Sequence, residues 1–423
     1  MYIYNYDTRT IDQININLPK ELIFSEGFND YIENLPECVE KIIFGLGTKR
    51  NNCNYKFEYL VTKEKLFNDF DSISKFNNNS INNLPNTIKW IIFPCESTFN
   101  TELKSFPNNL ELLVLGKNYK KKLNNLPESL KYFFYFISDF YDNIKYLPDT
   151  IEYIGIITNN IKSLEKIPSK TKLFKICPLN SIKFTSCDIG NVSNLIDKLP
   201  DCMEKLIITS NFYSDIKFLP SNLTKLKITQ LNKLDLLTKL PNHLLELDIR
   251  FENTIIPSNF DEFNSNLPCC LKKLSLDYCK VQPIHKKCFI NLGSLPDSLE
   301  YLSIKDNLDN SILDNLPTSL KFLKIESILL DSQKDNINIF SNLPRGLEKL
   351  LIVIYPYNLN NIEPIIQLQN LPESLIELVI FSKFKYTLDK EYLQITIHHF
   401  ENRIVDENNN YDMKYLQFDE LFF

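Results

Sequence analysis

The chain has 423 residues, of which 43% are hydrophobic and 24% charged, and its formal net charge is -6. These values are typical of a folded protein and exclude the basic footprint of a nucleic-acid-binding protein. No apolar run approaches the roughly eighteen residues needed to cross a bilayer, and the N-terminus lacks a secretory signal pattern. We therefore expect a cytoplasmic protein with no membrane or nucleic-acid partner.

One short phrase recurs along the whole chain. It is a Leu-Pro corner, or a close variant, followed by apolar residues at the first, fourth and sixth places of a run that begins three positions after the proline. Fixed phrases that recur at this scale are the signature of repeat architectures. The corner prolines are Pro19, Pro36, Pro85, Pro107, Pro127, Pro148, Pro168, Pro200, Pro220, Pro241, Pro268, Pro296, Pro317, Pro344 and Pro372.

The copy at residues 295–304 shows what the phrase predicts. Leu302 and Ile304 are two positions apart, so in a strand they point to the same side, which we assign to the core. Pro296 has a fixed φ and no N–H, and therefore suits a corner before the strand. Such a strand cannot bury its apolar face alone, but stacked copies can form a continuous core. The sequence predicts an α/β repeat solenoid: a curved array with a parallel sheet of short strands on its concave face and mostly loops on its convex face.

This phrase resembles two known kinds of repeat. The pattern L-x-x-L-x-[LI]-x-x-[NC] resembles the leucine-rich repeat, with asparagine in the last place at Asn118, Asn159, Asn211 and Asn307 and a cysteine at Cys279. The leading L-P-x-[ST]-L is similar to the FNIP repeat of social amoebae and giant viruses. The Phe-Asn-x-Pro half of that repeat is mostly missing, and most copies lack the asparagine. If the chain is viral, the resemblance implies the host-cell cytoplasm.

The repeats divide the chain into segments. We expect an N-terminal cap at residues 1–17, a solenoid at 18–382 and a C-terminal cap at 383–423. A long insertion at about 48–83 replaces a coil, and the apolar spacing from Thr62 to Ile73 predicts a short amphipathic helix within it. Alternation at Leu393, Ile395 and Ile397 predicts a final strand.

Motifs for catalysis or cofactor binding are absent from the sequence. There is no nucleotide loop, nucleophile elbow or metalloprotease helix, so we expect no enzyme activity and no cofactor. His285, Cys288 and Cys279 form an incomplete zinc set, for which an ordinary polar loop is the favoured alternative.

The concave face carries the candidate binding residues, because the third, fifth and seventh places of each run point away from the core. An early aromatic stripe is either a docking patch or a surface covered by residues 48–83 or by the N-terminal cap. The later charged positions are either a solvated face with cross-strand pairs or a binding surface. The candidates are Trp90, Leu112, Tyr132, Phe134, Phe136, Tyr153, Lys205, Lys225, Lys227 and Arg250.

These features predict a monomeric, non-enzymatic scaffold that binds an unknown protein partner on its concave face. The alternative is the substrate-recognition subunit of an F-box-type ubiquitin ligase, because related repeat proteins often carry an F-box before the array and residues 18–22 resemble an F-box opening. Too few residues precede the next corner for such a helical module.

Overall fold

The computed structural model describes the greater part of the repeat phrases. The described residues are 2–4, 20–32, 35, 37–45, 73–136, 147–157, 167–177, 199–208, 218–231, 240–251, 266–278, 295–305, 315–327, 336–338, 342–354, 365–368, 370–381, 386–388 and 396–400. The chain divides into two compact units, residues 1–244 and 245–423. They are treated separately below, and the predicted arrangement of two caps around one array stays a prediction.

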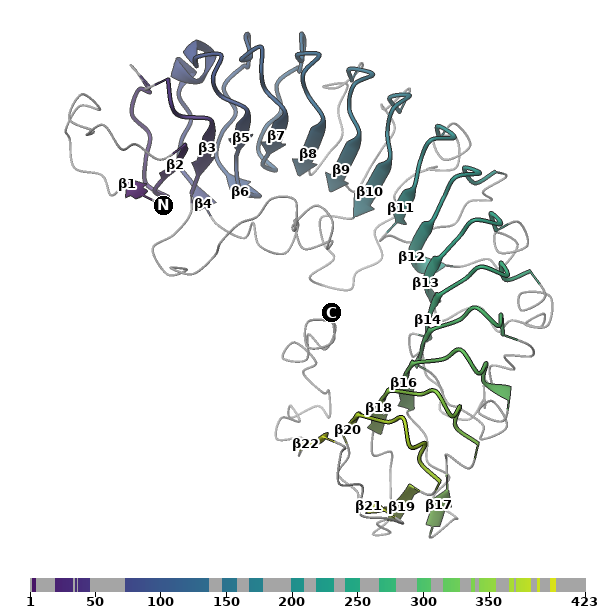
Figure 1. Cartoon of the computed structure of the whole chain (residues 1–423). Helices are drawn as coiled ribbons and strands as arrows, with labels where there is room; N and C mark the ends of the chain where they lie inside the picture. The colour runs from purple at the N-terminus through teal and green to yellow at the C-terminus, as the bar shows by residue number, and fades with distance from the viewer. Residues whose placement is uncertain are drawn as a thin grey trace. The chain divides into compact units, whose positions relative to one another are not determined.

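The first unit is built on a parallel sheet in which each strand pairs with the strand of the next coil (Figure 1). A two-stranded sheet and one 3-10 helix, η3 (Asn79–Asn83), complete its described elements. The parallel strands are β1 (Tyr2–Tyr4), β2 (Glu21–Phe24), β3 (Lys41–Phe44), β5 (Trp90–Ile92), β7 (Leu112–Leu115), β8 (Tyr132–Phe136), β9 (Tyr153–Ile157), β10 (Leu173–Cys177), β11 (Lys205–Ile208) and β12 (Lys225–Leu231), and the small sheet pairs β4 (Ile73–Ser74) with β6 (Glu96–Ser97).

The second unit repeats this plan with its own run of parallel strands. A smaller three-stranded parallel sheet is formed by segments that lie between its main strands in the sequence. The main strands are β13 (Glu246–Phe251), β14 (Lys273–Tyr278), β15 (Tyr301–Lys305), β16 (Phe322–Ser327), β18 (Lys349–Ile354), β20 (Glu377–Phe381) and β22 (Thr396–Phe400), and the smaller sheet contains β17 (Asn336–Asn338), β19 (Ile365–Leu368) and β21 (Tyr386–Leu388). The predicted class, a repeat solenoid with a parallel sheet of short strands, is confirmed in both units.

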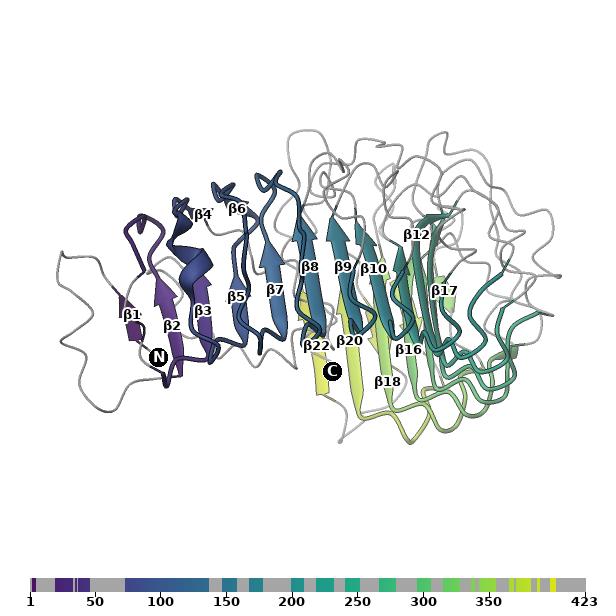
Figure 2. The ribbon, with the colours of Figure 1, turned by 90° about the horizontal axis from the view of Figure 1, so that it is seen from above.

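The Leu-Pro phrase makes the turn that enters each strand. At every corner from Pro85 to Pro372, the proline carbonyl oxygen accepts a hydrogen bond from the backbone N–H three residues later, at 3.0 to 3.2 Å. The residue just before a strand extends the hydrogen bonding between neighbouring strands. The carbonyl oxygen of Glu111, for example, accepts from the N–H groups of both Lys131 and Tyr132 in the next coil, at 2.9 Å each. Figure 2 shows the resulting side-by-side strands of the first unit.

The predicted core positions are buried. Leu302 and Ile304 are both fully buried, as are Leu113 and Leu115 in the first unit. In β15 the neighbouring Tyr301 and Ser303 remain partly exposed, which is the alternation expected when one side of a strand faces a core, whereas in β7 the neighbouring Leu112 and Val114 are buried as well.

A second apolar column in the first unit was not part of the sequence prediction. Phe28, Phe76 and Phe99 are buried in successive coils on the side opposite the sheet, and the rings of Phe76 and Phe99 stack with centroids 6.0 Å apart. Each of these three phenylalanines is followed by an asparagine. These side chains close the core of the coils from the loop side.

Residues 73–83, the described part of the expected insertion, follow this same plan. They contain β4 and η3, with Phe76 and Ile81 buried in the core. The amphipathic helix predicted from Thr62 lies outside the described residues except for its end, Ile73, which is in a strand. A final strand was predicted around Leu393 to Ile397, and β22 confirms it with a later start, at Thr396.

The beginning of the array bears on the F-box alternative. Residues Glu21–Phe24 form β2, which pairs with β3 through residues Lys41–Phe44. Because an F-box is helical, the strand at Leu22 is evidence against an F-box opening at this point.

Candidate functional site

The open face of each unit is the sheet surface that carries the third, fifth and seventh places of the runs. Strand pairing aligns these places across coils, so that Trp90, Leu112, Tyr132 and Tyr153 follow one another on neighbouring strands. These four candidate residues of the sequence prediction therefore share one face of the sheet. The sequence could not show which of them are accessible.

The apolar part of this face in the first unit is a buried cluster. Leu112, Phe134 and Phe136 are at most 2% exposed, which contradicts an exposed docking stripe at these three positions. The covering segments that the sequence prediction named, residues 48–83 and the N-terminal cap, lie mostly outside the described residues. The three candidates pack in one cluster with other open-face side chains: Ile23, Ile43, Ile92 and Val114.

Three aromatic candidates at the margin of this cluster remain partly exposed. Trp90, Tyr132 and Tyr153 pack against the cluster but are not fully buried. The rings of Tyr132 and Tyr153 stack with centroids 4.9 Å apart, and Lys41 places its Nζ 3.7 Å from the centroid of the Trp90 ring. Burial raises the pKa of the Tyr153 hydroxyl. These rings are the accessible apolar part of the open face.

The basic candidates of the first unit lie on β11 and β12. Lys205 and Lys225 are register partners, so two like charges lie side by side, and Lys227 is opposite Ile207. All three lysines are partly exposed, and Lys225 and Lys227 both have interaction partners.

A charged ladder crosses the open face of the second unit. It occupies the seventh place of four successive runs, where Arg250, Asp277, Lys305 and Glu326 are register partners on β13 to β16. Arg250 Nε lies 3.3 Å from Asp277 Oδ2, and Lys305 Nζ lies 3.3 Å from Glu326 Oε2. Lys324, two residues before Glu326 on β16, also contacts it at 2.7 Å. Of the four, the sequence prediction selected Arg250 as a site residue; aligning the seventh places would have shown the alternating signs.

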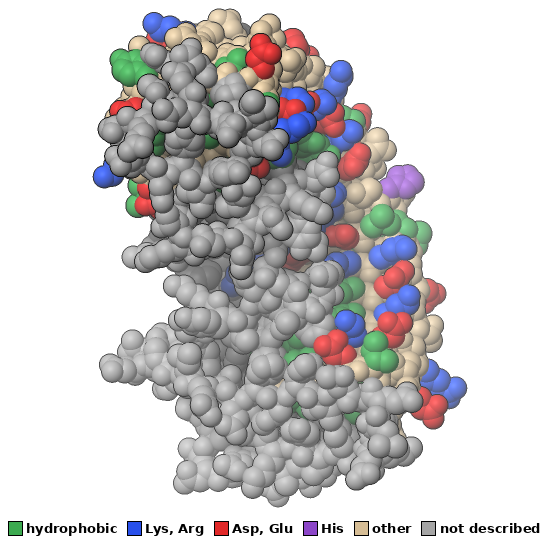
Figure 3. Space-filling view, turned by 60° about the vertical axis from the view of Figure 1, so that its left-hand side comes forward, with side chains coloured by type: hydrophobic (Ala, Val, Ile, Leu, Met, Phe, Trp, Pro, Cys, Tyr) green, Lys and Arg blue, Asp and Glu red, His purple; other side chains and the backbone are tan. Residues whose placement is uncertain are grey.

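A second charged column precedes the strands and is more exposed. Glu40 contacts Lys20 at 3.0 Å and Lys89 at 3.2 Å. Hydrogen bonds from Lys20 and then Lys89 lower the pKa of the Glu40 carboxyl. Exposed pairs of this kind contribute little to stability. Figure 3 shows basic and acidic side chains interspersed over the described surface in that view, with no large area of one sign.

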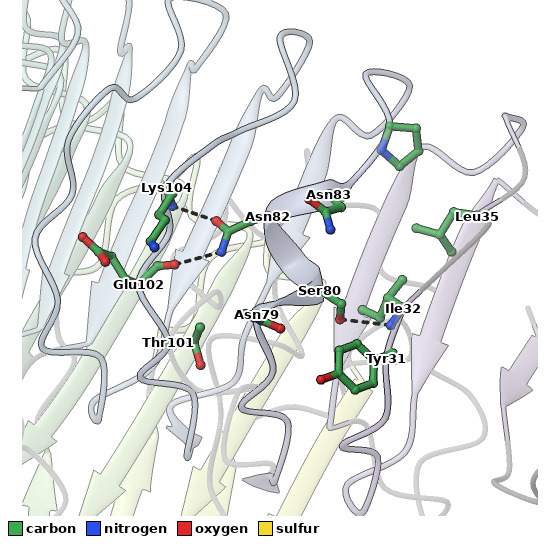
Figure 4. A pocket seen from close by; sticks show the side chains of 11 residues that line it. Tyr31, Ile32, Leu35, Asn79, Ser80, Asn82, Asn83, Thr101, Glu102 and Lys104 are labelled. Carbon is green, nitrogen blue, oxygen red and sulfur yellow. Dashed lines mark hydrogen bonds between the residues drawn. The ribbon is translucent and has the colours of Figure 1, made fainter.

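A hollow of about 840 Å³ lies around η3 in the first unit (Figure 4). Tyr31, Ile32 and Leu35 line one side, and Asn82 with the loop that carries Glu102 and Lys104 lines the other. The side-chain amide of Asn82 donates to the Glu102 carbonyl oxygen at 3.0 Å and accepts from the Lys104 N–H at 2.7 Å, so it holds two coils together. The hollow has no set of convergent polar groups that identifies a ligand.

Among the described residues, no group of three or more His, Cys, Asp or Glu side chains is arranged to hold a metal ion, and no helix is long and apolar enough to span a membrane. The possible zinc residues Cys279, His285 and Cys288 lie outside the described part of the chain.

Comparison with known proteins gives likenesses of fold. No family model matches the chain, and no curated protein matches it. Among solved structures, it is similar to CroV588, described as a circular LRR protein, at 19% identity with a TM-score of 0.40 over 92% of this chain and 64% of that one. It is also similar to YopM from Yersinia enterocolitica, at 18% identity with a TM-score of 0.34 over 87% of this chain and 74% of that one. The chain thus spans less than two thirds of the length of CroV588. Its own strand pairing and core positions give it the architecture of a leucine-rich-repeat-type solenoid.

Proposed function

We propose that the chain is a non-enzymatic protein-interaction scaffold that binds a protein partner on the open face of its sheet. The observation that carries this proposal is the partly exposed group of Trp90, Tyr132 and Tyr153 at the margin of the buried cluster. Interface cores favour aromatic side chains, and rigid strands hold these rings in a fixed relation to one another. A parallel-strand solenoid also presents a broad surface, which suits a macromolecular partner better than a small substrate.

The finer parts of the proposal rest on the sequence. The L-P-x-[ST]-L phrase and the Phe-Asn pairs at Phe28, Phe76 and Phe99 support a repeat of the FNIP type. We propose a monomer that acts in the cytoplasm. No observation favours the F-box alternative.

The test compares two variants by proximity labelling in cells that express the protein. Tyr132→Ser combined with Tyr153→Ser removes the stacked ring pair, whereas Tyr31→Ser removes a ring that is 65% exposed on the loop side. Trp90 is the only tryptophan of the chain and reports folding of the first unit by its fluorescence.

We expect the double variant to lose a defined set of labelled proteins, at least tenfold in abundance, which the Tyr31→Ser variant retains. An unchanged labelled set, with native Trp90 fluorescence in the double variant, would remove the open face of the first unit as the binding surface.

A further inference from the structure

The charged ladder of the second unit contains a carboxylate in an unfavourable place. Asp277 Oδ2 faces Arg250, but Oδ1 is buried and accepts no hydrogen bond within the described part of the chain. A buried acceptor without a donor costs free energy, and the cost is larger for a charged group. The surroundings of Asp277 on β14 therefore stabilise its ionised form only in part.

Glu326, two strands away in the same ladder, is in the opposite situation. Its side chain is only 7% exposed, but both of its oxygens are engaged: Oε1 by Lys324 at 2.7 Å and Oε2 by Lys305 at 3.3 Å. Two ammonium groups thus hold Glu326 as an anion despite its burial. The two carboxylates of one ladder differ in how well they are paired.

Four charged groups among the described residues act on Asp277: Arg250 and Asp248 on β13, Lys305 on β15 and Glu326 on β16. Lys324 acts on Glu326, which it contacts at 2.7 Å. The four residues of the ladder are two cations and two carboxylates, so the ladder is neutral when all four are ionised. Loss of one negative charge makes it positive.

The effect on titration follows from these contacts. Burial raises the pKa of Asp277, and the attraction of Lys305 and Arg250 does not fully offset it, while Glu326 and Asp248 add repulsion. Burial alone would also raise the pKa of Glu326. The positive charges of Lys324 and Lys305 and their hydrogen bonds outweigh burial, so the pKa of Glu326 is lowered. On acidification the proton is expected at Asp277 before Glu326.

We propose that the ladder is a pH-responsive element of the open face, in which Asp277 takes up a proton while Glu326 stays ionised, so that Arg250 is released from its ion pair and the ladder gains one positive charge. The protonated Asp277 carboxyl can rotate its O–H toward a neighbouring acceptor, and Oδ1, which accepts no hydrogen bond, no longer carries negative charge. This inference does not depend on the proposed function, because it concerns the charge of the surface and not its partner.

The linkage to stability has opposite signs at the two residues. The folded state holds the Asp277 proton more tightly than the unfolded chain, so ionised Asp277 lowers stability above its folded pKa, and this loss disappears as the pH falls through that value. Glu326 contributes stability above its unfolded pKa, and this contribution is lost as the pH falls through its lower folded pKa. Asn at position 277 and Gln at position 326 should therefore act in opposite directions at pH 7.

The first experiment measures the titration directly. The full chain is labelled with ¹³C at its Asp and Glu carboxyl carbons, and the resonances of residues 277 and 326 are assigned by their loss in Asp277→Asn and Glu326→Gln. We expect the Asp277 midpoint to lie above the Glu326 midpoint. Equal midpoints, or the reverse order, would overturn the proposal. If Asp277→Asn does not fold, Arg250→Gln identifies the same resonance by moving its midpoint further up.

The second experiment uses hydrogen exchange of the full chain at pH 7, read by mass spectrometry from peptides that cover β14 to β16. Asp277→Asn should exchange as slowly as the wild type or more slowly, whereas Glu326→Gln should exchange at least tenfold faster. Faster exchange in Asp277→Asn would show that ionised Asp277 stabilises the fold, and would contradict the proposal.

Discussion

Ser129 donates its hydroxyl hydrogen bond to the carbonyl oxygen of Leu110, in the preceding coil, with 2.8 Å between the oxygens. Thr150 makes the same bond to Leu130 in the coil that follows, at 3.2 Å. In the second unit Ser319 bonds to Leu299 at 2.7 Å. The Ser or Thr of the L-P-x-[ST]-L phrase therefore holds these corners to the coil before them, whereas Thr87, at the same place, has a buried hydroxyl without a hydrogen-bond partner among the described residues.

Removing this hydroxyl should weaken the first unit without changing its fold. Ser129→Ala leaves the Leu110 carbonyl without its partner, and we expect the free energy of unfolding to fall by about 1 kcal/mol. Ser129→Thr is the matched control, since Thr150 makes the bond at the equivalent place of the next coil. Denaturant titration followed by Trp90 fluorescence measures both. Equal loss in the two variants would mean that packing, rather than the hydrogen bond, matters at this position.

The sequence predicted the strands because their signal is local. Core positions such as Leu302 and Ile304 follow from the two-residue period of a strand and from the proline before it. The Phe-Asn column was missed because its distance to the next corner varies: Phe76 lies one residue further from Pro85 than Phe99 does from Pro107. In the Phe76 coil, η3 occupies this longer stretch.

The accessibility of the open face could not be predicted in the same way. Phe134 and Tyr132 occupy equivalent kinds of position on β8, yet Phe134 is 2% exposed and Tyr132 is partly exposed. Which of the two is buried depends on how the side chains of several coils pack together in the cluster, and the two-residue period of one strand does not specify that packing. The Arg250–Asp277 pair, in contrast, needs only the strand register, which the corners already fix.

Gly45 should not tolerate a side chain. Its φ of +79° lies in the left-handed region, and an added Cβ would overlap the carbonyl oxygen of Ile73. Strain from the backbone and overpacking against it should together cost about 2–4 kcal/mol in Gly45→Ala. Gly27→Ala is the control, because nothing lies within 4 Å of an added Cβ there. Trp90 fluorescence during denaturation measures both; a near-neutral Gly45→Ala would contradict the close approach of Gly45 and Ile73.

Asn77 links three coils through its backbone and its side chain. Its N–H donates to Asn29 Oδ1 at 2.8 Å, and its own Oδ1 accepts from the Asn100 N–H and the Thr101 hydroxyl, each at 2.9 Å. Asn77→Leu removes both accepted bonds and should lower the free energy of unfolding by about 1 kcal/mol, because these groups are exposed and can bond to water instead. Asn77→Asp keeps an acceptor at the same place and should retain most of the stability. If Asp were as destabilising as Leu, the side-chain oxygen would not be the linking group.

Tyr119 should make the first unit sensitive to alkali. Its ring is fully buried, its hydroxyl oxygen accepts from the Leu103 N–H at 3.4 Å, and burial raises its pKa to about 12. The unfolded chain releases this proton near pH 10, so between pH 10 and 12 the folded state holds more protons and stability falls as the pH rises. A shift of this size corresponds to a loss of about 3 kcal/mol across that window.

Tyr119→Phe removes the ionisable group and should flatten this part of the pH dependence, although the lost hydrogen bond lowers stability at every pH. Unfolding free energies are to be compared at pH 9 and at pH 11.5, again from Trp90 fluorescence, with Tyr31→Phe as the control at an exposed ring. The difference between wild type and Tyr119→Phe should shrink as the pH rises. A difference that stays constant would show that Tyr119 ionises in the folded state as readily as in the unfolded chain, and would contradict its burial behind Leu103.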